Sequence, residues 1–146
     1  MTVQRIDQGM AARAARALPD GGVDKELRTR YRQLRAMLPG AGLAATYAYI
    51  ASKAKTGPKA DKLGKAYAAA EQAIRERIFP VGDVPGSARA ALARLGEMGA
   101  VDYARASAEA TAFVGWLSRL ADAVWQEAGG VNGDEDSAGA DGDGDA

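Results

Sequence analysis

The sequence predicts an all-α fold: a compact bundle of about six helices followed by a disordered acidic C-terminal tail. Helix-forming residues such as Ala, Leu, Arg, Lys and Glu are abundant, whereas aromatic residues make up only 6% of the 146 residues. Apolar residues recur at steps of three and four, which is the period of one helix face. We therefore expect one helical domain over residues 1–128 and a tail over residues 129–146.

The first half of the chain predicts three helices. The first covers residues 3–18 and ends at the turn Pro19–Gly22; its apolar face is Ile6, Met10, Ala14 and Ala17. The second follows the N-cap residue Asp24, with an apolar face of Leu27, Tyr31, Leu34 and Leu38. Pro39–Gly42 predicts a break or a tight corner, and the third helix then covers residues 43–55.

Three more helices are expected over residues 59–78, 87–98 and 101–126. Asp61–Lys65 and Glu71–Arg75 are acid-before-base pairs four residues apart, a pattern typical of an exposed helix. Lys59, Lys62 and Lys65 bring positive charge to the start of the first of these helices, where the helix dipole favours acids.

The last helix has two distinct faces. One should enter the core, since it consists of Tyr103, Ala106, Ala110, Phe113, Leu117, Leu120 and Val124. The roughly opposite face mixes charges with a tryptophan: Arg105, Glu109, Ala112, Trp116, Arg119 and Ala123. This mixture is unusual for a face that meets only water, and we interpret it as a functional surface.

Charge is distributed unevenly along the chain. Six acidic residues and no basic residue follow Gly129, which leaves 19 basic against 13 acidic residues before it, a net charge of +6. This asymmetry suggests a polyanionic partner for the helical part. Ordinary surface charge with a solubilising tail explains it equally well.

Three arginines of the second helix form the densest basic cluster. Arg28, Arg32 and Arg35 share one helix face, and no acidic residue on that face relieves their repulsion. Such a ridge is usually solvated, but it is also the best candidate for contact with nucleic-acid phosphates.

Composition argues against several functions. The chain has no His and no Cys, so zinc sites of those ligands, Ser-His and Cys-His nucleophile pairs, and disulfides are excluded. We expect no catalytic residue, cofactor or metal, although an enzyme that uses carboxylates is still conceivable. The segment 57–66 fails as a P-loop, and the acidic tail lacks the glutamate of a calcium loop. No apolar run could span a membrane, which suggests a soluble cytoplasmic protein.

Two stretches resemble one known family. Residues 37–53, MLPGAGLAATYAYIASK, look like the Gly-Leu…Ser-Lys segment of the small subunit of the Cmr complex, the type III-B CRISPR effector. Residues 103–110, YARASAEA, followed by 116–121, WLSRLA, resemble the C-terminal helix of that family. There are departures, such as Ala41 for the usual Asn and Ala104 for the usual Arg.

This resemblance implies a non-catalytic helical subunit in antiviral defence. Copies of it would stack along the complex, beside the other Cmr subunits, and contact the guide RNA and the target RNA. The resembling motifs add Lys53, Arg105 and Arg119 as RNA-contacting candidates beside the three arginines, and Glu109 and Trp116 as interface candidates; Arg105 and Glu109 could also pair with each other. The alternative is a helical adaptor that binds another protein through Trp116, without nucleic acid.

Overall fold

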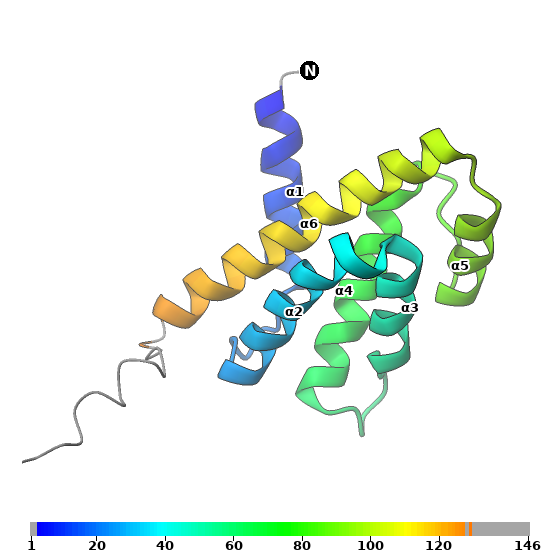
Figure 1. Ribbon diagram of the computed structural model, residues 1–146. Helices are drawn as coiled ribbons and strands as arrows, with labels where there is room; N and C mark the ends of the chain where they lie inside the picture. Colours follow the sequence, from blue (N-terminus) through cyan, green and yellow to red (C-terminus); the bar gives the residue numbers. More distant parts are fainter. Residues whose placement is uncertain (1–2, 128, 130–146) are drawn as a thin grey trace, which may run out of the picture.

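The computed structural model describes residues 3–127 and 129, with side-chain surroundings from Gln8 to Trp125 (Figure 1). These residues form six α-helices and no strand, which confirms the all-α prediction. The helices are α1 (Val3–Ala17), α2 (Lys25–Ala41), α3 (Leu43–Lys53), α4 (Lys62–Ile78), α5 (Ala88–Glu97) and α6 (Ala100–Glu127). The tail predicted to be disordered lies, apart from Gly129, outside the described residues, as does the side chain of Ile6.

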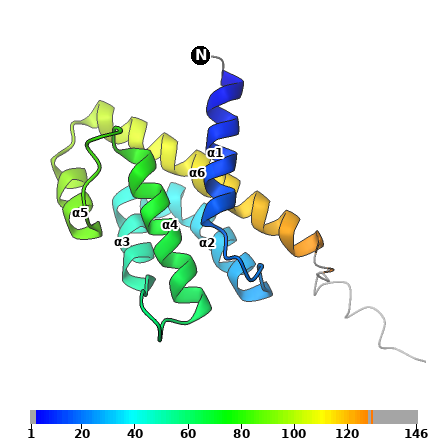
Figure 2. The same ribbon diagram turned by 180° about the vertical axis from the view of Figure 1, so that it is seen from behind.

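Helix α6 runs across the other helices and contacts α1, α2, α3 and α4 (Figure 1). Its predicted core face is confirmed at the centre, where Ala106, Ala110, Phe113 and Leu117 are buried; Tyr103, Leu120 and Val124 are partly buried. The buried surface is wider than predicted, because Val114, Ser118 and Ala121 are also buried. Helix α4 lies behind α3 in Figure 1 and comes to the front in Figure 2, where it packs against α1 and α3.

The break between α2 and α3 is a single residue. Of the predicted break or tight corner over residues 39–42, the structure has the tight corner, and it lies later than Pro39 because α2 continues through Pro39 to Ala41. Pro39 lies in the last turn, where it removes only one backbone donor, and the N–H of Gly42 closes that turn on the Leu38 carbonyl at 2.9 Å. Gly42 has a φ of 89°, a conformation that other residues rarely adopt.

The segment between α3 and α4 is longer than predicted. Helix α3 ends at Lys53 and α4 begins at Lys62, because Asp61 is the N-cap of α4: its carboxylate accepts a hydrogen bond from the Gly64 N–H at 2.9 Å. The predicted Asp61–Lys65 ion pair is not among the salt bridges of the described residues.

The Glu71–Arg75 pair forms, but it does not mark an exposed face. Glu71 is only 8% exposed, and its carboxylate accepts hydrogen bonds from the Tyr47 hydroxyl and, at 2.9 Å, from Arg75 Nε. Arg75 also donates to the Pro85 carbonyl at 2.8 Å. The hydrogen bonds of Tyr47, Glu71 and Arg75 therefore connect α3, α4 and the loop before α5, and they give the buried Glu71 carboxylate its partners.

Candidate nucleic-acid interface

The three arginines of α2 differ in depth. Arg28 is 9% exposed; its Nε donates to Asp122 of α6 at 2.8 Å, and its guanidinium lies 5.5 Å from the centre of the Trp125 ring. Arg32 is exposed and approaches the same Asp122 carboxylate at 3.1 Å. The interpretation that no acid relieves this ridge holds only along α2, because packing brings Asp122 to it from α6.

Arg35 lies further along α2, and its side chain is exposed. Among the described residues it has no salt-bridge partner. Arg32 and Arg35 are therefore the two members of the ridge that an external phosphate can reach, whereas Arg28 is held inside the fold. We call Arg28, Arg32 and Arg35 the α2 ridge.

The candidates on α6 are spread along its length. Arg105 is exposed and lies 4.0 Å from Asp102, while Glu109 pairs with Arg77 of α4 at 2.9 Å. The suggested Arg105–Glu109 pair is therefore wrong, because packing against α4 offers Glu109 a partner from another helix.

Trp116 and Arg119 form a second contact on α6. The Arg119 guanidinium lies 5.8 Å from the centre of the Trp116 ring, and Trp116 is partly buried against the core. A cation over an indole face is a favourable arrangement that leaves the outer side of the guanidinium available. This pair is thus a preformed aromatic and cationic surface on α6.

Lys53 is exposed at the C-terminal end of α3, with its Nζ 5.8 Å from the centre of the Tyr49 ring. Of the six RNA-contacting candidates, the structure joins Arg28 and Arg32 through Asp122. It gives no direct contact, among the described residues, between that pair and Lys53, Arg105 or Arg119.

Of a larger lysine cluster, the sequence analysis named Lys53 as a site candidate and Lys59, Lys62 and Lys65 only as unusual charge at a helix start. Five lysines lie where α3 ends and α4 begins, and the backbone N–H of Lys55 donates to the Gly64 carbonyl at 2.9 Å, which holds the connecting segment against α4. We call this cluster the lysine end: Lys53, Lys55, Lys59, Lys62 and Lys65. None of the five forms a salt bridge among the described residues. Their density in the sequence was the available signal.

Titratable groups elsewhere serve the fold. Burial, followed by the hydrogen bond to Glu71, raises the pKa of the Tyr47 hydroxyl well above its ordinary range. No group of three or more Asp, Glu, His or Cys residues in the described part of the chain could hold a metal ion. No helix in that part is long and apolar enough to cross a membrane.

Comparison with protein families gives a match over most of the chain. Residues 5–124 match the model of the family described as CRISPR-associated protein (Cas_Cmr5). Comparison with curated proteins finds no match. The matched range contains α2 to α5 entirely, together with both stretches that resemble the Cmr small subunit. The chain therefore belongs to the Cas_Cmr5 family and is a small-subunit component of the Cmr complex of type III-B CRISPR systems.

Proposed function

We propose that this chain is a non-catalytic subunit that contacts the backbone of the guide and target RNA in the cytoplasm, stacked beside copies of itself. The observation that carries the proposal is the α2 ridge. Arg32 and Arg35 present exposed guanidiniums on one helix face, and the ion pair between Arg28 and Asp122 fixes that helix against α6.

Arginine suits this role because its planar guanidinium can donate two parallel hydrogen bonds to a phosphate. Contacts to phosphates position a protein on nucleic acid without reading its sequence. Specificity would come from base pairing between guide and target, as in other RNA-guided effectors. The absence of His and Cys from the sequence supports a role without catalysis, because the most frequent general base and the thiolate nucleophile are missing.

The Trp116–Arg119 pair supports contacts with neighbouring subunits. Tryptophan and arginine are enriched at the energetic centres of protein interfaces, and here one already packs on the other. We assign this surface, with Glu109 about two turns earlier on the same helix, to a neighbouring subunit or a second copy. Replacing Trp116 by Ala should reduce incorporation of the subunit into a reconstituted Cmr complex, and unchanged incorporation would contradict the assignment.

A salt titration of RNA binding tests the proposal. Full-length protein should bind a single-stranded RNA with an affinity that falls steeply with salt. Arg35→Gln should reduce the slope of log K against log salt by about 0.7, the value for one lost contact with a single strand. Arg89 on α5 is the matched control, since it is also an exposed helical arginine without a salt bridge in the described part of the chain.

The control variant Arg89→Gln should leave that slope unchanged. Equal slopes for Arg35→Gln and Arg89→Gln would show that binding depends on net charge and not on the α2 ridge. No RNA binding at low salt, either by the subunit or by the complex at this ridge, would overturn the proposal.

A further inference from the structure

The lysine end is unusual among the charged groups of this protein. Most of the arginines whose side chains are described pair with a carboxylate: Arg13 with Glu76, Arg77 with Glu109 and Arg94 with Asp83, all within 3.0 Å, are examples. The five lysines have no such partner among the described residues. The one acid within their sequence range, Asp61, is engaged in capping α4. Of the other acids nearby, Asp20 lines a cavity together with Lys62 and Lys65, whereas Asp24 caps α2 and Glu26 pairs with Arg30. The fold thus leaves an excess of positive charge at this place.

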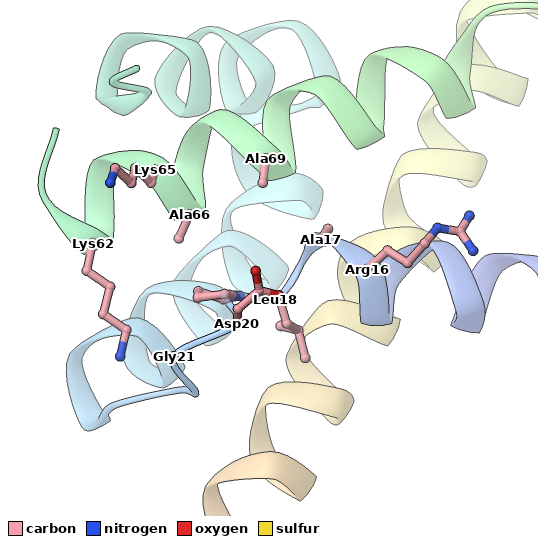
Figure 3. Close-up of a pocket in the computed structure, with 10 residues that line it drawn as sticks. Arg16, Ala17, Leu18, Asp20, Gly21, Lys62, Lys65, Ala66 and Ala69 are labelled. Carbon is pink, nitrogen blue, oxygen red and sulfur yellow. The ribbon is translucent and has the colours of Figure 1, made fainter. Parts of the chain in front are cut away.

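A surface cavity adjoins these lysines. It has a volume of about 550 Å³ and lies between the C-terminal end of α1 and the first half of α4. In Figure 3, Lys62 and Lys65 lie on one side of it, small side chains such as Ala66 and Ala69 form its wall, and Arg16 extends away on the other side. The cavity can therefore admit a narrow, small-residue segment whose charges meet the lysines at its edge.

The chain itself contains a segment of complementary charge with mostly small side chains. Residues 130–146 carry six acids and no base, and the remaining residues are mostly Gly and Ala. The acids fall in two groups of three: Asp134, Glu135 and Asp136, then Asp141, Asp143 and Asp145. Their six negative charges compare with the five lysines and Arg16, while Asp20 is the one acid among the residues that line the cavity.

The end of α6 is close enough for this segment to reach the lysine end. Trp125 near the end of α6 lies against Arg28 in the first turns of α2, 5.5 Å from ring centre to guanidinium carbon. The neighbouring Leu27 lines a small cavity together with Lys62 of α4. A chain segment that runs from the end of α6 past α2 to Lys62 on α4 therefore covers two distances between packed helices. At about 8–10 Å each, these add up to about 20 Å. Asp134 is seven residues beyond Glu127, and seven extended residues span up to about 25 Å.

We propose that the acidic segment 130–146 docks on the lysine end of the same chain, along the cavity between α1 and α4, and competes there with RNA. The contact is electrostatic, so it weakens as salt shortens the range of charge interactions. Its role is to hold polyanions off this surface until an RNA with more phosphates displaces the segment. The competition with RNA rests on the proposed function, whereas the docking itself does not.

A spin label tests the docking directly. The chain has no cysteine, so Ser137→Cys creates a single labelling site between the two acidic groups. In the full-length ¹⁵N-labelled protein, the label should broaden the amide signals of residues 53–65 and 16–21 at low salt, and high salt should remove this effect. The matched control adds D134N, E135Q, D136N, D141N, D143N and D145N, which keep the length but remove the charge, and should show no broadening there.

Broadening at other residues, or equal broadening with the neutral segment, would overturn the docking. A further measurement mixes ¹⁵N-labelled protein that has no spin label with spin-labelled protein that has no ¹⁵N. Broadening of the ¹⁵N signals in this mixture would also overturn the proposal, since the segment would then dock on a second copy.

An RNA titration tests the competition. The neutral-segment variant should bind single-stranded oligouridylate about 3- to 10-fold more tightly than the unmodified protein at low salt, and equally at high salt, because charge competition is screened there. If both bind equally at low salt, competition is wrong while the proposed function stands. If the spin label shows docking but neither protein binds RNA, the proposed function fails and the docking stands.

Discussion

Arg28 and Asp122, 94 residues apart in the sequence, are joined by a hydrogen bond of 2.8 Å that links α2 to α6. The Trp125 ring lies over the same guanidinium, so a residue that the spacing of α2 places on a charged ridge is also part of the packing between two helices. Arg28 therefore has a structural role in the packing of α2 against α6, whereas Arg32 and Arg35 are available for RNA. Stability measurements can distinguish these two roles.

Replacing Arg28 by Gln should lower the free energy of unfolding by about 1–2 kcal/mol, since a nearly buried charge-assisted hydrogen bond and an aromatic contact are lost. Arg32→Gln is the matched control: it removes a partner of the same carboxylate, but its side chain is 53% exposed, so the change should stay below about 0.5 kcal/mol. Urea unfolding measures both values. Equal effects would contradict the structural role of Arg28.

The hydroxyl of Tyr31 is buried and has no hydrogen-bond partner in the described part of the chain. Tyr31→Phe should therefore be neutral or stabilising at pH 7. Tyr47→Phe removes a donor to the buried Glu71 carboxylate and should cost about 1–3 kcal/mol. Thermal unfolding of the two variants compares them, and a larger loss for Tyr31→Phe would refute the expectation.

Burial also raises the pKa of the Tyr31 hydroxyl well above its ordinary value of 10.0. The unfolded chain then ionises first as pH rises, so this tyrosine costs stability above about pH 10. The unmodified protein should lose stability between pH 10 and pH 11 faster than Tyr31→Phe does. Parallel pH profiles would show that Tyr31 ionises as easily in the folded chain as in the unfolded one.

Glu76 should contribute stability that depends on pH in the acidic range. Partial burial raises its pKa, but hydrogen bonds from Arg13 and Gln72 outweigh this, so the pKa lies below the ordinary value of 4.5. A lowered pKa in the folded state stabilises the protein above pH 4.5 and loses this effect as pH falls through the folded value.

Glu76→Gln should accordingly lower stability at pH 7 by less than about 1 kcal/mol, because the pair is partly exposed, and the difference should shrink as the pH falls below 4.5. Glu97→Gln is the control, since Glu97 is exposed and has no salt bridge in the described part of the chain. Urea midpoints at pH 7 and pH 3 measure the difference. A difference as large at pH 3 as at pH 7 would contradict the prediction.

Two helical glycines should respond to alanine in opposite directions. A Cβ on Gly64 would lie 2.7 Å from Cβ of Lys55, so Gly64→Ala should destabilise the protein by about 1–3 kcal/mol. A Cβ on Gly115 would meet nothing within 4 Å, so Gly115→Ala should stabilise it by about 0.5–1 kcal/mol. Differential scanning calorimetry separates the two. Stabilisation by Gly64→Ala would mean that Lys55 does not hold the connecting segment against α4.

The sequence was sufficient for the helical architecture because each helix carries its own apolar period, and caps such as Asp24 act locally. Helix ends were harder to predict. Pro39 was expected to lie at the end of α2, but the helix continues through it to Ala41, and Gly42 makes the corner. The start of α4 depended on which residue caps it, and Asp61 does.

The candidate site was less predictable, because its pairings join distant residues. Spacing places Arg28, Arg32 and Arg35 on one face, but it cannot show that α6 covers Arg28 and supplies Asp122. Glu109 likewise finds Arg77 across a helix interface and not Arg105 on its own helix. Their contact with RNA stays a prediction. The lysine end was visible in composition, yet its proximity to α2 and to the end of α6 required the fold.

The single residue between α2 and α3 has a mechanical consequence. Gly42 is the one residue between α2 and α3. Just beyond it, the Tyr103 hydroxyl of α6 accepts a hydrogen bond from the Ala44 N–H at 3.0 Å. The angle between α2, which carries the α2 ridge, and α3, which leads to the lysine end, therefore depends on the backbone conformation of Gly42. Because Gly42 carries no charge, a substitution there by another uncharged residue should change the spacing between the two basic surfaces without changing any charge.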